Sequence, residues 1–314
     1  MKKIIALTLA LLMALACVSA VAEETYNIGI VQLVQHEALD QATKGFQDAL
    51  TELLGDKVKF DLQNASGDAP TCATIVNGFV AADVDLIMAN ATPALQAAVA
   101  ATADIPVLGT SISHYGTALD MNDDWQGFTG LNVSGTSDLS PLNEQAAMVK
   151  ELFPEAKSVA LLFCSAEANS VYQVDVIEAE LNSLGYTTQR FAFTDSNDVA
   201  ALAEQATACD VIYIPTDNTA ATYTETIANV VLPAGKPTIT GEEGLCRGCG
   251  VATLTISYYD IGYKTGEMAY DILVNGADIS AMPIAFAPQF VKKYNAANAE
   301  ALNVTIPEGY EALE

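Results

Sequence analysis

Residues 85–92 read Asp-Leu-Ile-Met-Ala-Asn-Ala-Thr, an apolar run that ends in a cluster of small polar residues. Three other segments have the same form: 106–109 before Thr110 and Ser111, 158–163 before a stretch ending in Asn169 and Ser170, and 211–215 before Thr216, Asp217 and Asn218. Runs this apolar, each followed by a helix-like segment, predict parallel strands that are buried on both faces. Because ligands of such sheets bind beyond the carboxyl ends of the strands, the polar clusters predict a site for a small polar molecule.

Strands and helices alternate on both sides of these runs. Strands are expected at 26–33, 58–63, 86–89, 106–110, 159–163, 187–193, 211–214, 238–241 and 251–256, and a final extended stretch at 284–292. Helices are expected at 37–54, 70–82, 93–101, 141–153, 169–184, 199–209, 220–232, 258–274 and 296–302. The glycine-rich stretch 111–142 breaks the pattern, with one short strand at 128–133, and we interpret it as the first crossover between two lobes.

The expected fold class is α/β, with two doubly wound parallel-sheet lobes joined by a multi-strand hinge. The first lobe is predicted to comprise 23–112 and 257–283, the second 132–253 and 286–314, and the hinge crossovers 113–131, 254–256 and 284–285. Two such lobes enclose a cleft whose walls are strand ends from both sides. This architecture favours binding over catalysis.

The N-terminus has the form of a secretory leader. Lys2 and Lys3 precede an apolar stretch at 4–16, and Ala20-Val21-Ala22 provides a small-x-small cleavage site, so residues 1–22 are the predicted signal peptide. Cys17 offers an alternative, a lipoprotein-type box, although Ala14 stands where such a box normally has leucine. In either case we expect a chain that is exported to the periplasm or the cell surface, with a lipid anchor on Cys17 in the second case.

Charge and cysteine content exclude some classes of protein. The formal net charge is −26, which repels phosphate backbones, so no nucleic-acid partner is expected. Without Cys17 five cysteines remain, and this odd number excludes a complete disulfide framework. Cys246-Arg247-Gly248-Cys249 lies among glycines and is expected in a loop leading into a strand, with either a local disulfide or free thiols. No metal and no cofactor are expected.

Several short motifs occur in a familiar order. They are 32–40 (Gln-Leu-Val-Gln-His-Glu-Ala-Leu-Asp), 64–68, 91–94, 137–141, 167–171, 215–219, 241–243 and 257–266. Together they resemble the tryptophan/tyrosine-type family of ABC-transporter substrate-binding proteins, a branch of the type I periplasmic-binding-protein fold. The resemblance covers nearly the whole mature chain and implies a hinge-closing receptor, generally a monomer, that delivers a solute, often an aromatic amino acid, to membrane permease subunits. The chain departs from the family at 111–115 and at the Cys246–Cys249 segment.

An amino-acid ligand needs an anion for its ammonium group and donors for its carboxylate. Asp217 is expected either to anchor the ammonium or to cap the next helix, and Glu242 either to add a second anionic contact or to lie in an exposed loop. The carboxylate donors are expected at helix starts and strand ends, namely Thr92, Ser111, Asn169 and Ser170, each of which is alternatively a helix cap, and the two roles are compatible. The remaining candidates are Gln35 and His36, which should roof the cleft, and Thr216 and Asn218 beside Asp217; His36 is either a surface loop residue or a hydrogen-bond partner of the ligand.

Rival functions are weighed by the residues they require. No nucleophile elbow, phosphate loop or dinucleotide turn is present, and His36 and His114 are the only histidines, so an enzyme is not expected. An extracellular sensor with the same fold stays an alternative. A receptor for a nucleoside or a sugar is another, although 7% aromatic content makes a sugar site less favourable.

Overall fold

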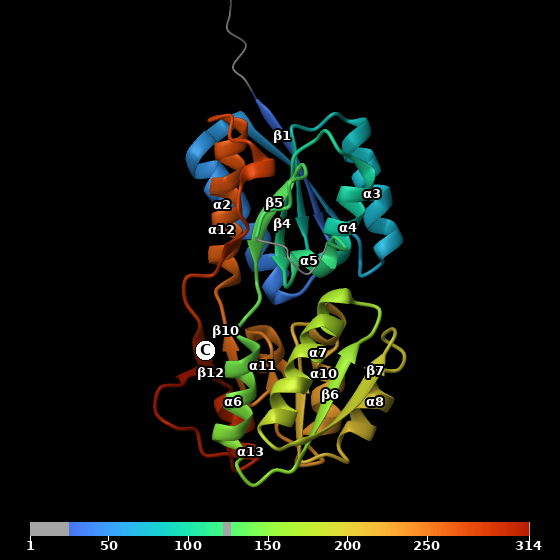
Figure 1. Ribbon diagram of the computed structural model, residues 1–314, viewed down its shortest axis with the longest axis vertical. Coiled ribbons are helices and arrows are strands. Elements are labelled where there is room, and N and C mark those ends of the chain that lie inside the picture. The colour runs from blue at the N-terminus through green and yellow to red at the C-terminus, as the bar shows by residue number, and fades with distance from the viewer. Residues whose placement is uncertain (1–24, 122–126, 314) are drawn as a thin grey trace, which may run out of the picture.

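The computed structural model describes residues 25–121 and 127–313 and consists of two α/β lobes, one above the other in Figure 1. The predicted leader at 1–22, including Cys17, lies outside the described residues. Each lobe has one sheet with helices on both faces, because its apolar strands must be covered on both sides. The expected fold class is confirmed.

The first lobe contains a six-stranded sheet in the order β11-β5-β4-β3-β1-β2. Its strands, each parallel to its neighbours, are β1 (Tyr26–Gln32), β2 (Val58–Asn64), β3 (Leu86–Asn90), β4 (Val107–Ile112), β5 (Val133–Ser137) and β11 (Ala285–Phe286). Helices α2 (Glu37–Leu54) and α12 (Tyr258–Leu273) cover one face, and α3 (Ala69–Ala81) and α4 (Thr92–Ala101) cover the other. Short helices complete the lobe: η1 (Gly55–Lys57), α5 (Tyr115–Ala118) and η2 (Ile279–Ala281).

The second lobe contains a seven-stranded sheet in the order β13-β12-β10-β9-β8-β6-β7. Its strands are β6 (Ser158–Cys164), β7 (Thr187–Phe193), β8 (Val211–Ile214), β9 (Thr238–Thr240), β10 (Ala252–Thr255), β12 (Val291–Tyr294) and β13 (Glu311–Ala312), of which β12 is antiparallel to β10. Helices α6 (Leu142–Leu152) and α7 (Ala168–Ser183) cover one face. The other face carries α8 (Val199–Ala206), α10 (Thr224–Val231) and α11 (Glu243–Cys249), with α9 (Asn218–Thr222) and α13 (Ala296–Ala301) at the ends of the sheet.

The first crossover differs from the expectation. We expected a crossover strand at 128–133 and a second lobe from residue 132, but β5 begins at Val133 and pairs with β4 in the first sheet. The sequence of β5, Val-Ser-Gly-Thr-Ser, is buried throughout although it is mostly small and polar, which hides it from a search for apolar runs. The chain therefore crosses to the second lobe after Ser137. It crosses again between β10 and α12, and a third time between β11 and β12.

The Cys246–Cys249 segment is a helix, not the expected loop. We expected a loop because of the glycines, but Gly248 serves helix packing. A Cβ on Gly248 would lie 2.3 Å from Thr224 Cβ, so the absence of a side chain allows α11 to pack closely on α10. Glu242 starts the helix by accepting bonds from the backbone of its first turn. All five cysteines of the described part are buried free thiols: Cys72, Cys164, Cys209, Cys246 and Cys249. Of the two alternatives for Cys246 and Cys249, the structure therefore has the free thiols and not the local disulfide.

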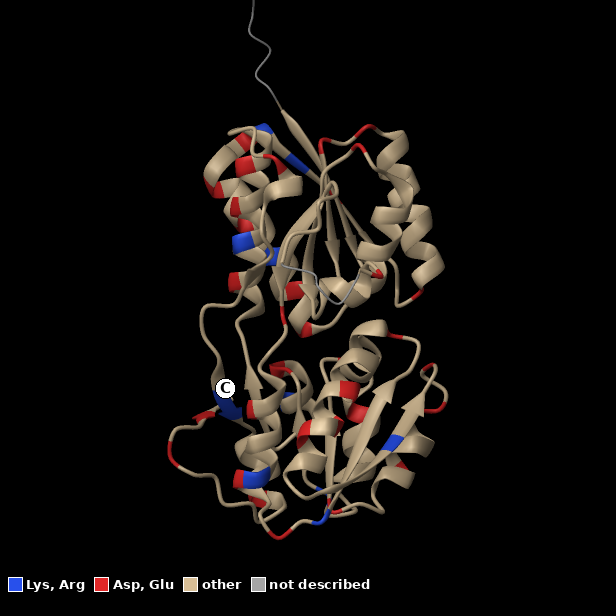
Figure 2. Ribbon diagram, in the orientation of Figure 1, with Lys and Arg blue, Asp and Glu red and all other residues tan. Residues whose placement is uncertain are grey.

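Acidic residues are spread along the ribbon of both lobes in Figure 2, and they outnumber the basic residues by 39 to 13 in the full sequence, which gives the net charge of −26. Among residues 25–121 and 127–313, no helix has both the length and the apolar character needed to cross a bilayer.

Candidate ligand-binding site

The carboxyl ends of the central strands of both sheets meet between the lobes, and the lobes touch there (Figure 1). His36 Nε2 lies 3.1 Å from Asn218 Oδ1, and Gln173 Nε2 donates to Ser113 Oγ at 3.3 Å. The ring of His114 stacks on that of Tyr172, with centroids 4.1 Å apart. Each pair joins the first lobe to the second, so the cleft is closed.

Three buried oxygens in this closed cleft have no hydrogen-bond partner within the described part of the chain. They are Ser111 Oγ at the end of β4, Asp138 Oδ1 just after β5, and Asn169 Oδ1 in the first turn of α7. The residues are 7%, 3% and 5% exposed. Buried polar atoms are ordinarily paired, so three of them at the meeting point of two lobes indicate a site for a polar ligand. Asn90 Oδ1 is unpaired as well, but the amide nitrogen of this residue is turned toward α2.

Asp138 is the most distinctive member of the site. Tyr258 donates to its Oδ2 at 2.9 Å. Burial raises the pKa of Asp138, and hydrogen bonding, first of all that from Tyr258, opposes this rise. A carboxylate that is buried, with one oxygen unpaired, is a strong attractor for a cation.

Asp217 caps a helix, one of the two roles predicted for it. Its Oδ1 accepts from Ala220 N at 2.8 Å and its Oδ2 from Cys164 N at 2.6 Å. The carboxylate therefore ties the end of β6 to the start of α9. Burial raises the pKa of Asp217 to about 7, with the nearby carboxylate of Glu167 as a second cause. An ammonium-binding role for Asp217 stays a prediction, and its engaged oxygens do not favour it.

Around Asp217 the other predicted residues form one network. Asn169 Nδ2 donates to Thr216 O at 3.2 Å, and Asn218 Nδ2 donates to Glu167 Oε2 at 2.6 Å. Glu167 also accepts from the backbone of Asn218 and Thr219, so it supports the first turn of α9. His36, between the lobes, has its pKa lowered by burial.

The predicted site residues of the first lobe differ from one another in burial. Thr92 is buried at the first position of α4, and Ser111 is held at a φ of 57° beside it. Gln35 is exposed. Thr92 and Ser111 thus reach the cleft at the carboxyl ends of β3 and β4, whereas Gln35 lies at the rim of the cleft.

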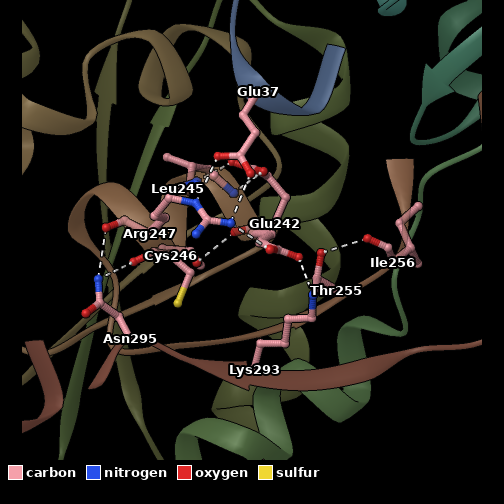
Figure 3. A network of polar contacts seen from close by, with 12 residues as sticks. Glu37, Glu242, Leu245, Cys246, Arg247, Thr255, Ile256, Lys293 and Asn295 are labelled. Atoms are coloured by element: carbon pink, nitrogen blue, oxygen red, sulfur yellow. Dashed lines mark hydrogen bonds and ion pairs between the residues drawn. The ribbon is translucent and has the colours of Figure 1, made fainter. Parts of the chain in front are cut away.

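Glu242 lies on the hinge side of the cleft, and the exposed-loop alternative for it is wrong. It is 2% exposed and accepts from Gly244 N at 2.6 Å and Leu245 N at 2.5 Å, and burial raises its pKa to about 7. Figure 3 shows it beside Arg247, which reaches Glu37 of the other lobe at 3.0 Å. A cavity of about 290 Å³ opens here, lined in part by Glu242, Tyr258 and Lys293.

A second cavity, of about 270 Å³, opens elsewhere between the lobes. Its apolar lining comes from both lobes: Leu33, Val34 and Pro93 from the first, Cys164 and Tyr223 from the second. It borders the polar site through Glu167 and Asn218, which also line it. The cleft therefore combines a polar interior with an apolar wall.

Sequence reasoning missed four buried polar residues of the cleft, namely Ser113, Asp138, Glu167 and Gln173. Asp138 follows a strand, and the rule that ligands bind at strand ends would have found it had β5 been placed correctly. No sequence signal marked Gln173, which lies in the middle of a helix.

Two α/β lobes that close over a polar cleft, with three chain crossings as the hinge, define a solute-binding receptor of the type I periplasmic-binding-protein fold. The chain belongs to the family of ABC transporter substrate binding proteins, whose family model matches residues 27–312. Proteins of this family work outside the cytoplasm.

Relatives of known structure or function agree with this assignment. A tyrosine-binding protein of Clostridioides difficile (strain R20291) is 36% identical over 265 residues, which cover 82% of this chain and 75% of that protein. The solved structure of an ABC domain in complex with L-Trp from Streptococcus pneumonia is 32% identical, with a TM-score of 0.87, over 92% of this chain and all of that one.

A third relative distinguishes two arrangements of the lobes. The ligand-free, open structure of a substrate-binding protein with adhesive properties from Clostridium difficile is 34% identical and covers 92% of this chain and 99% of its own. Its TM-score is 0.70, lower than that of the L-Trp complex despite similar identity. The lobes here are thus arranged more as in the complex than as in the open form, in agreement with the contacts between them.

Proposed function

We propose that this chain is the receptor of an ABC importer for an aromatic amino acid, which it binds as a zwitterion and presents to permease subunits in the membrane. The observation that carries the proposal is the unpaired Oδ1 of Asp138 in the closed cleft. A ligand ammonium at this oxygen would pair a buried carboxylate that burial otherwise destabilises. The ammonium anchor is therefore Asp138 in this proposal, rather than Asp217.

The ligand carboxylate would be held by neutral donors. Ser111 Oγ is unpaired, Thr92 stands at the start of the ten-residue helix α4, and the backbone N–H groups at the start of the sixteen-residue helix α7 would add donors from the second lobe. The unpaired Oδ1 of Asn169 can only accept and would face the ligand ammonium instead. Free backbone N–H groups and the helix dipole at such starts favour an anion. Donors from both lobes make the bound ligand a bridge, which stabilises closure.

The ligand side chain would lie in the cavity of about 270 Å³ beside Glu167. Its apolar lining from both lobes, including Val34, Pro93 and Tyr223, suits an aromatic ring. The relatives named for tyrosine and solved with L-Trp support this ligand class. Sugar-binding proteins of the same fold are more distant; one for glucose and galactose is 16% identical, so it supports the fold alone.

Thermal unfolding with a panel of amino acids, nucleosides and sugars tests the ligand class. A ligand at 100 times its dissociation constant adds about 2.7 kcal/mol to the free energy of unfolding. We expect the midpoint to rise with tryptophan, tyrosine or phenylalanine. A rise with a nucleoside or sugar alone would keep the receptor and reject this ligand.

Two matched variants test the anchor. Asp138→Asn keeps the shape but removes the charge, and we expect the affinity measured by calorimetry to fall about 30-fold, or roughly 2 kcal/mol, because a charged hydrogen bond is lost. Asp217→Asn keeps one acceptor oxygen but places an NH2 group against the backbone N–H of Cys164 or Ala220, so it should lower thermal stability while changing affinity less than threefold. The opposite result would return the anchor to Asp217.

A further inference from the structure

The main chain on either side of Asp138 is tied to the end of β4. Asp138 N donates to Ile112 O at 3.3 Å, and the preceding Ser137 Oγ donates to Ser113 O at 3.0 Å. The same Ser137 Oγ accepts from Leu139 N at 3.2 Å, which closes a turn around Asp138. These bonds fix the backbone of Asp138 to the first lobe, so the freedom that remains to this residue is rotation of its side chain.

Tyr258 removes that freedom from the carboxylate. Its hydroxyl donates to Asp138 Oδ2 at 2.9 Å, although the two residues are 120 positions apart in the chain. The carboxylate is thereby asymmetric: Oδ2 bonds the protein, whereas Oδ1 has no partner within the described part of the chain. The last torsion of an aspartate side chain is otherwise broad. The phenol therefore decides which of the two oxygens is left for a ligand.

Tyr258 is itself anchored in the first lobe. It is the first residue of α12, where Ser257 Oγ caps the helix by accepting from Asp260 N at 3.1 Å. Its ring belongs to a small apolar cluster that includes Ala38 and Ala42 of α2, and it forms part of the wall of the hinge-side cavity. Phenol and carboxylate are thus both fixed on the first-lobe side of the hinge, and their bond does not depend on the position of the second lobe.

We propose that Tyr258 is a positioning residue of the binding site, which holds Oδ2 of Asp138 and so leaves Oδ1 directed at the ligand ammonium. The inference rests on the proposed function, because it takes Asp138 to be the ammonium anchor. The hydroxyl hydrogen of Tyr258 is already donated to the carboxylate, so Tyr258 acts on the ligand through Asp138. Two effects strengthen binding: the donated bond favours the charged carboxylate, and a carboxylate fixed in advance loses no freedom when the ligand arrives.

A double-mutant cycle tests the positioning by calorimetry on the whole mature protein, with whichever of tryptophan, tyrosine and phenylalanine binds most tightly. Tyr258→Phe keeps the ring in the cavity wall and removes only the hydroxyl. We expect its affinity to fall about tenfold, or roughly 1.4 kcal/mol. In the Asp138→Asn background the same change should cost less than twofold, because the charge that the phenol positions is already gone.

A matched control and a second ligand separate positioning from a structural role. Tyr259→Phe is the control: Tyr259 is the next residue of α12, and its hydroxyl also donates to a carboxylate, Asp48 Oδ2 at 3.0 Å, so its loss should leave affinity unchanged. The second ligand is the arylpropionate that corresponds to the amino acid without its ammonium group, used at millimolar concentration. Tyr258→Phe should bind it as well as the wild type does, since it offers nothing for Asp138 Oδ1 to hold.

The outcomes distinguish the positioning from the function on which it rests. Wild-type affinity in Tyr258→Phe, a tenfold loss in both backgrounds, or equal losses for the amino acid and the arylpropionate would overturn the positioning and leave the receptor proposal intact. If Asp138→Asn binds the amino acid as tightly as the wild type, the anchor is wrong and the positioning is rejected with it. Binding of no amino acid by the wild type would reject the receptor proposal and the positioning together.

Discussion

Glu242 illustrates what burial does to a single helix-capping carboxylate. Its pKa is raised to about 7, mainly by burial, from an ordinary value of 4.5. The folded chain therefore binds this proton more tightly than the unfolded chain, and the stability that Glu242 contributes is present at low pH and lost as pH rises through about 7. Asp217 acts in the same direction, and His36, whose pKa burial lowers, acts in the opposite one.

Comparing Glu242→Gln with the wild type isolates this one titration. Between pH 5 and 8 we expect the free energy of unfolding of the wild type to fall more steeply with pH than that of the variant, by at most about 1.4 kcal/mol per pH unit. Urea unfolding of the ligand-free protein at four pH values measures the slopes. Glu204→Gln, an exposed position on α8, should keep the wild-type slope. A variant slope equal to that of the wild type would show that Glu242 stays charged throughout.

At the residue scale the sequence predicted the neighbourhood of the site better than its chemistry. Asn169 and Ser111 follow apolar runs, and both reach the cleft with an unpaired oxygen. Asp217 follows such a run too, yet its oxygens are taken up by backbone N–H groups that come from β6 and α9. No sequence pattern tells which strand-end carboxylate is engaged by its own lobe. That depends on the three-dimensional path of neighbouring loops.

Helices α2 and α12 approach each other so closely that glycine is required at the contact. A Cβ on Gly262 would lie 2.0 Å from Ala42 O, and one on Gly45 would lie 2.1 Å from Tyr259 O. These distances join a side chain to backbone, which cannot rotate away. The contact fixes the last long helix of the first lobe against the first one, although the two are far apart in sequence.

We expect Gly262→Ala to lower the free energy of unfolding by about 1–3 kcal/mol, because the helices must separate to admit the methyl group. Gly78→Ala in α3 is the matched control, since nothing lies within 4 Å of its added Cβ. That change should be neutral or stabilise by up to about 1 kcal/mol through helix propensity. Urea unfolding measures the free energy of unfolding of both variants. Equal values for Gly262→Ala and Gly78→Ala would mean that the contact between α2 and α12 is loose.

At the element scale, prediction succeeded where a strand is apolar and a helix is long, as in β3, β6 and α2. It failed for β5, whose small polar residues are buried by neighbours on both sides, and for α11, whose glycines serve packing. The segment 220–232, expected as one helix, is divided into α9 and α10 at Tyr223. In each case tertiary contacts override the local signal.

For the whole molecule, closure brings together surfaces that lie in different lobes. Besides the contacts in the cleft, an ion pair joins them at the hinge side: Arg247 on α11 binds Glu37 at the start of α2 through two nitrogens, each at 3.0 Å. Arg247 is held for this contact by Glu243 at 2.8 Å, and Glu243 in turn binds Lys293. Both partners of the interlobe pair are more than one-third exposed, so water and salt weaken it.

An exposed pair that forms only on closure should make ligand affinity depend on salt. We expect Arg247→Gln to weaken binding roughly 1.4- to fivefold at low ionic strength, because such a pair contributes about 0.2–1 kcal/mol. The difference in affinity between the wild type and Arg247→Gln should shrink as salt is added, because salt screens the ion pair of the wild type. Calorimetry of both proteins at about 20 mM to about 1 M salt measures this difference. Arg190→Gln is the control, since Arg190 pairs with Asp175 and Glu178 inside the second lobe and should leave affinity unchanged. If both arginine variants lose affinity equally, the effect comes from the overall charge of this acidic protein and not from the contact between its lobes.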